Sequence, residues 1–183
     1  MAGLLRTIVV TALACLACNG IAQAAGGNYV FDGGTARQQE QICRALAASS
    51  FNWTVVPATI TIHVRAGYET EARPGEIWLD ANLVDSGKFA WGIIQHEYAH
   101  QVDFFLLDDE LRARLARKLG GGSWWGVGAA DHDEVTSERF ASTLAWAYWH
   151  SKENCLRPTS RRDESAAMRP RAFRSLVAAT LPL

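Results

Sequence analysis

The stretch from Trp91 to Phe104, WGIIQHEYAHQVDF, places two histidines four residues apart in a largely apolar segment. Residues i and i+4 of an α-helix are about 400° of rotation apart, so His96 and His100 project side by side. Two imidazoles in this arrangement can bind one metal ion at zinc–nitrogen distances of about 2.0–2.1 Å. Glu97 lies about 100° round the helix from His96, near enough to reach a water on the metal. The stretch therefore predicts two metal ligands and a general base.

A hydrolytic zinc site also needs a third protein ligand and one position left for water. A histidine six residues after His100 would supply the ligand, but that position is Leu106. Asp103 follows on the same helix face and is better placed to accept a hydrogen bond from a ligand imidazole. The stretch DEVTSERFA offers two acids one helical turn apart, Glu134 and Glu138. One of them can bind the metal while the other accepts a proton from a ligand histidine and orients its ring.

These two segments together resemble the gluzincin metallopeptidases, in which an HExxH helix is followed by a second helix with a glutamate and an acid four residues later. The similarity is to small forms whose second motif is E-x-x-A-D-x-F-A, and this chain has EVTSERFA from Glu134 to Ala141. The chain departs from that motif with Ser137 in place of alanine and Glu138 in place of aspartate. The resemblance extends over about Gly75 to Trp149.

The resemblance implies a zinc ion held by His96, His100 and Glu134, with Glu138 orienting a ligand histidine. It also implies peptide hydrolysis, because zinc lowers the pKa of its bound water to about 7. Glu97 would take a proton from this water during attack on a peptide carbonyl and pass it to the leaving amine. A non-catalytic zinc-binding protein and a zinc hydrolase of cell-wall amides are the alternatives.

The resemblance further implies that an extended peptide or protein substrate lies along the strand GEIWLD, from Gly75 to Asp80. His132, two residues before Glu134 and beside a glycine-rich loop, is a candidate donor to the developing oxyanion, with a solvated loop histidine as the alternative. Trp124 and Trp125 in the same loop are candidates for substrate contact.

The first 25 residues have the layout of a secretory signal, with Arg6, an apolar run from Ile8 to Cys18, and an A-x-A-like cleavage site made by Ala22 and Ala24 around Gln23. We expect cleavage there, a secreted or periplasmic location, and one domain from residue 26 to 183. A lipid-anchored form is the alternative. The apolar run is shorter than the roughly 20 residues of a spanning helix, so we expect no membrane segment after cleavage.

Two cysteines, Cys43 and Cys155, remain beyond the leader, and an even pair in an oxidising compartment favours a disulfide. Two separate buried thiols are the alternative. The formal charge of −1 becomes −2 when Arg6 leaves with the signal, which gives no reason to expect nucleic acid as a partner. We expect a monomer.

Hydrophobic periodicity predicts an α+β single domain in which a short antiparallel or mixed sheet packs on the HExxH helix and on a second helix with a metal ligand. Two strands are clear, at 58–67 and 74–83. Helices are predicted at 35–49, with Thr35 as N-cap, and at 86–106, 108–119, 133–151 and 170–181.

Overall fold

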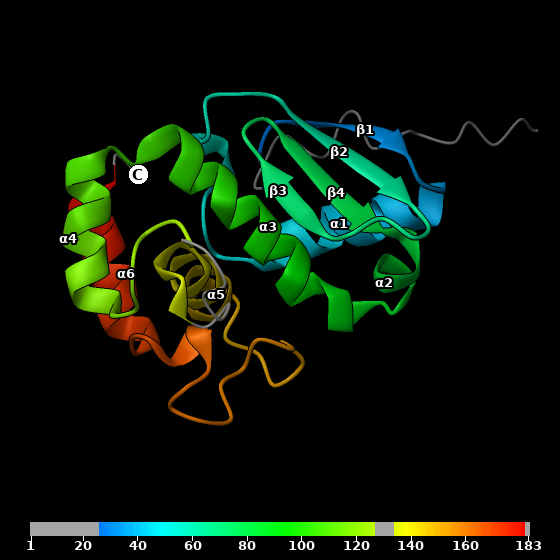
Figure 1. The fold of residues 1–183 in the computed structure, drawn as a ribbon. Helices are drawn as coiled ribbons and strands as arrows, with labels where there is room; N and C mark the ends of the chain where they lie inside the picture. The colour runs from blue at the N-terminus through cyan, green and yellow to red at the C-terminus, as the bar shows by residue number, and fades with distance from the viewer. Residues whose placement is uncertain (1–25, 127–133, 182–183) are drawn as a thin grey trace, which may run out of the picture.

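The computed structural model describes residues 26–126 and 134–181 of the chain (Figure 1). The predicted signal segment and His132 lie outside these described residues. Within them the chain forms six α-helices and a four-stranded mixed sheet, which confirms the predicted α+β class. None of the helices in this part of the chain is long and apolar enough to cross a membrane.

The sheet has the strand order β1-β2-β4-β3. The two inner strands are β2 (Ile60–Arg65) and β4 (Glu76–Asp80), which are parallel to each other. The outer strands are β1 (Tyr29–Gly33), parallel to β2, and β3 (Glu71–Arg73), antiparallel to β4. The outer strands were not predicted, because β1 is short and follows a glycine-rich segment, and β3 is three polar or small residues long.

One face of the sheet is buried by two helices, α1 (Ala36–Ala48) and α3 (Lys88–Leu106). The predicted alternation of β2 is confirmed, since its isoleucines and valine are buried while His63 is partly exposed. Thr35 caps α1 as predicted, and Gln38 completes a capping box with it. A short helix, α2 (Ala81–Asp85), connects β4 to the α3 segment.

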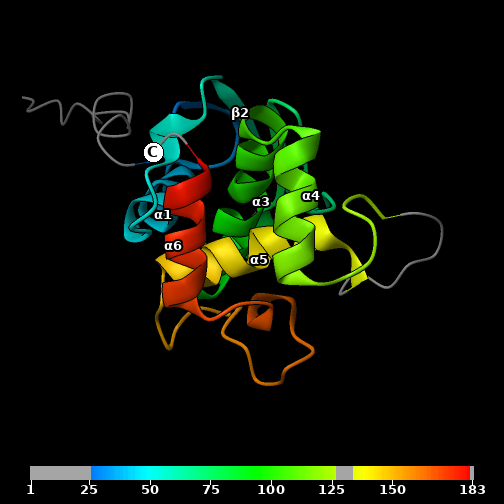
Figure 2. The ribbon, with the colours of Figure 1, turned by 90° about the vertical axis from the view of Figure 1, so that its left-hand side faces the viewer.

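Three further helices lie beyond α3, on the side away from the sheet (Figures 1 and 2). They are α4 (Asp109–Leu119), α5 (Thr136–Tyr148) and α6 (Pro170–Thr180). α5 packs against α3 on one side and against α6 on the other. Between α5 and α6, the ring centroids of Phe140 and Phe173 lie 5.9 Å apart. α3 is therefore covered by the sheet and by α5, which explains why its polar residues His96, Glu97 and His100 are buried.

The structure contains no disulfide between Cys43 and Cys155, and both side chains are half-buried. Burial raises the pKa of the Cys155 thiol. The predicted bond is therefore not seen in the described part of the chain.

Candidate metal centre

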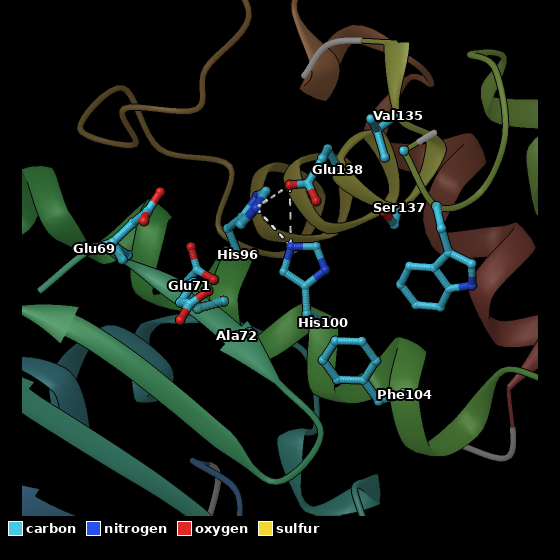
Figure 3. Close-up of a pocket in the computed structure, with 13 residues that line it drawn as sticks. Glu69, Glu71, Ala72, His96, His100, Phe104, Val135, Ser137 and Glu138 are labelled. Atoms are coloured by element: carbon cyan, nitrogen blue, oxygen red, sulfur yellow. Dashed lines mark hydrogen bonds and ion pairs between the residues drawn. The ribbon is translucent and has the colours of Figure 1, made fainter. Parts of the chain in front are cut away.

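Three side chains from α3 and α5 converge on one point between these helices (Figure 3). Nε2 of His96 lies 3.1 Å from Nε2 of His100 and 3.1 Å from Oε2 of Glu138. Nε2 of His100 lies 3.4 Å from the same Oε2. Both histidines are buried, and the Glu138 side chain is 18% exposed. Two imidazole nitrogens and a carboxylate oxygen thus form one compact group that could hold a metal ion.

These three distances agree with the edges of a coordination tetrahedron. Ligands about 2.0–2.1 Å from a zinc ion in tetrahedral geometry are about 3.3–3.4 Å apart, because the edge is about 1.63 times the bond length. The observed separations of 3.1, 3.1 and 3.4 Å are close to this value. Two histidines and one glutamate are also a donor set used by catalytic zinc sites, with the fourth position left open. The residues present therefore fit zinc in both chemistry and spacing.

His100 and Glu138 of this group shift each other's pKa values. Burial opposes the charged form of His100, but the hydrogen bond and negative charge of Glu138, together with the charges of Glu97 and Asp103, outweigh burial and raise the pKa of this imidazole. Burial also opposes the carboxylate form of Glu138, yet hydrogen bonds from His100 and His96 hold its pKa well below the usual range. The carboxylate therefore stays ionised in a buried position that favours a positive charge beside it.

The structure brings Glu138, and not Glu134, next to the two histidines. Glu134 lies outside the group, exposed, and precedes the first residue of α5, Thr136. It lines a separate hollow with Gly121 and Arg139. The predicted helix began at residue 133, which placed Glu134 on the same helix face as Glu138. In the structure α5 begins at Thr136, so Glu134 is not on this helix. Glu138 takes the place in the group that the resemblance gave to Glu134.

A residue that the sequence interpretation did not single out lies on the other side of His96. Nδ1 of His96 is 3.0 Å from Oγ of Ser142, which is one helical turn after Glu138 on α5. The sequence predicted a glutamate next to the metal and an orienting residue four positions later, at Glu134 and Glu138. The structure has the same spacing one helical turn later, at Glu138 and Ser142. The serine at this position was not recognised because only carboxylates were considered for the role.

Asp103 orients a different part of the site from the one predicted. Its buried carboxylate accepts hydrogen bonds at 2.8 Å from Nε of Arg112 and at 2.8 Å from Nε1 of Trp124. Burial raises the pKa of Asp103, although these two donors oppose the rise. The carboxylate therefore anchors Trp124 in the core rather than binding the ring of His100.

A cavity of about 490 Å³ opens beside the three converging side chains. Glu97, buried on α3, lines it next to both histidines. Phe104 and the exposed Trp125 form an aromatic side, with their rings stacked and the ring centroids 5.9 Å apart. The opposite side contains Glu71 of β3 and the neighbouring Glu69, as Figure 3 shows.

The strand that borders this cavity is β3 rather than the predicted strand from Gly75 to Asp80. That segment contains β4, which pairs with β2 on one side and β3 on the other, so its backbone groups are engaged within the sheet. β3 is an edge strand of the sheet, and its residues Glu71 and Ala72 line the cavity.

The comparisons with known proteins add no identification. No protein family matches the chain, and neither the curated proteins nor the solved structures searched contain a match. Any function of the chain must therefore be inferred from the geometry of the group on α3 and α5.

Proposed function

We propose that the protein is an exported zinc-dependent peptidase whose metal is held by His96, His100 and Glu138. The observation that carries the proposal is the convergence of two Nε2 atoms and one Oε2 atom at separations of 3.1–3.4 Å beside a cavity lined by Glu97. A purely structural zinc site is closed by a fourth protein ligand, and the described residues provide a group of three. The open cavity beside the group supports a catalytic role.

The chemistry divides between the metal and Glu97. A bound zinc ion supplies a Lewis acid and makes water acidic enough to lose a proton near neutral pH. Glu97 receives that proton while the water oxygen attacks the carbonyl carbon of a peptide bond. When the carbon–nitrogen bond breaks, Glu97 returns the proton to the leaving amine. Glu97 is suited to both transfers because it lines the cavity together with His96 and His100.

The walls of the cavity favour an extended peptide as substrate. Backbone groups on the outer edge of β3 can pair with an added strand, since β3 is the last strand of the described sheet. Trp125 and Phe104 provide an apolar surface for a substrate side chain on the opposite side. These features favour peptide over cell-wall amide as the substrate class.

The proposal is tested with purified protein, its Glu97→Gln variant and a broad mixture of peptides. We expect the wild type to contain about one zinc per chain and to hydrolyse peptides, and Glu97→Gln to keep the zinc without hydrolysis. A wild type that binds zinc but cleaves no peptide would contradict the proposal and favour a binding role. Cleavage of cell-wall fragments alone would favour the amide hydrolase.

A further inference from the structure

The side of His96 that faces away from the metal group contacts two polar residues in series. Nδ1 of His96 lies 3.0 Å from Oγ of Ser142, and this Oγ lies 2.6 Å from Oε2 of Glu164. Ser142 is buried on α5, whereas Glu164 begins a short 3₁₀ helix (Glu164–Ala166) in the segment between α5 and α6. A residue outside both metal-ligand helices is therefore linked to the metal group through one hydroxyl.

The direction of each hydrogen bond follows from what each group can donate. An ionised carboxylate only accepts, so the single hydroxyl proton of Ser142 is directed to Glu164. The separation of 2.6 Å is typical of an O–H···O⁻ hydrogen bond. The oxygen of Ser142 is then left to accept from Nδ1–H of His96. With a proton held on Nδ1, Nε2 is the nitrogen that can release its proton and offer a lone pair to a metal ion, and it faces His100 and Glu138.

We propose that Ser142 and Glu164 position His96 for metal binding, by fixing its Nδ1–H tautomer and the rotation of its ring. Both are positioning residues, because neither reaches the point where the three ligand atoms converge. The inference rests on the proposed metal site and adds a carboxylate from the segment after α5 to its support. Carboxylates that orient a ligand histidine in this way are a general feature of metal sites. Here a serine stands between the two groups.

The segment that contains Glu164 is also held by a contact that involves neither Ser142 nor His96. Oγ1 of Thr143, the residue after Ser142, donates to the backbone oxygen of Glu164 at 3.2 Å. Thr143 is buried on α5, as Ser142 is, but its hydroxyl bonds the backbone of Glu164 and not its carboxylate. Thr143→Val therefore loosens the same segment without removing a partner of His96, which makes it the matched control.

The first test compares zinc affinities measured by competition with a chelator of known affinity. Loss of an outer hydrogen-bond partner weakens metal binding by about 10–100-fold, so we expect a loss in this range for Ser142→Ala. Glu164→Gln keeps an acceptor for the hydroxyl but lacks the charge, and its loss should lie towards the lower end. Thr143→Val should bind zinc as the wild type does. Wild-type affinity in both Ser142→Ala and Glu164→Gln would overturn the inference, as would an equal loss in Thr143→Val.

The second test reads the tautomer of His96 directly from the ¹⁵N chemical shifts of its ring in metal-free protein. We expect a protonated Nδ1 in the wild type and a larger share of the Nε2–H form in Ser142→Ala. An unprotonated Nδ1 in the wild type would overturn the inference. Since this measurement needs no zinc, it separates the two proposals: failure of the wild type to bind zinc would refute the metal site alone. If Ser142→Ala does not fold, Glu164→Gln serves in both tests.

Discussion

Replacement of Glu138 by alanine should remove most of the stability that zinc adds to the folded protein. A ligand at 100 times its Kd stabilises the native state by about 2.7 kcal/mol if the unfolded chain does not bind it. For a domain of this size, 1 kcal/mol corresponds to about 2–4 °C in Tm, so zinc should raise the Tm of the wild type by about 5–11 °C. Glu138 supplies one of the three converging atoms, at 3.1 and 3.4 Å from the two imidazole nitrogens.

Loss of a residue that hydrogen-bonds a metal ligand weakens metal binding by up to about 100-fold. Loss of Glu138, a direct ligand in our proposal, should weaken zinc binding by at least this factor. At the same zinc concentration the site of Glu138→Ala would be half-filled at most, and the added stability would fall to about 0.4 kcal/mol. The expected rise in Tm is then less than about 2 °C. Glu134→Ala is the matched control, because it removes the same charge from an exposed position outside the group.

The assay is thermal unfolding of each protein with zinc and with chelator, so that differences between the metal-free proteins cancel. The wild type and Glu134→Ala should show the full rise in Tm, and Glu138→Ala should show almost none. A full rise in Glu138→Ala together with a lost rise in Glu134→Ala would refute the ligand assignment drawn from the structure.

Further predictions concern the base, the cavity wall and two structural carboxylates. Glu97→Gln should retain zinc by metal analysis while kcat falls by about 10²–10⁴-fold, and unchanged turnover would exclude Glu97 as the base. Trp125→Ala should raise KM about tenfold for peptides with an apolar side chain, since roughly 1.4 kcal/mol of contact is lost, with no such change for small polar ones. Trp124→Phe removes a hydrogen bond to the buried Asp103 and should lower the free energy of unfolding by about 1–3 kcal/mol in a denaturant titration. Asp163 accepts hydrogen bonds from Ser160 and Thr159, which hold the pKa of its carboxyl below the usual range. The ionised carboxylate therefore stabilises the folded protein at pH values above the unfolded pKa of about 3.9, and this stabilisation is lost as the pH falls through the folded pKa. Asp163→Asn should therefore lower Tm at pH 7, and a difference that persists undiminished at pH 2 would contradict this.

The positions of the helices were predictable because their patterns are long and have clear ends. α1 begins after Thr35, and α4 ends at Gly120, where a positive φ of 69° suits glycine. β1 and β3 were not predictable, because their pairing depends on β2 and β4 rather than on a pattern of their own. The edge position of β3, and hence the border of the cavity, follows from the sheet order alone.

The two histidines of the group could be predicted from the sequence, whereas its third member could not. Glu134 and Glu138 differ by one helical turn, so periodicity gives both the same face. The start of α5 decides between them, since Glu134 precedes this helix and Glu138 lies in its first turn. Glu164 gave no local signal at all, because its contact with Ser142 brings together residues 22 positions apart.

The central claim is that α3 and α5 hold one zinc ion through His96, His100 and Glu138. An anomalous-difference map at the zinc absorption edge, from a crystal of zinc-loaded protein, tests it directly. We predict one strong peak about 2.0–2.1 Å from Nε2 of each histidine and about 2.0–2.2 Å from a carboxylate oxygen of Glu138. A peak bound by Glu134, or no peak between the two helices, would contradict the account.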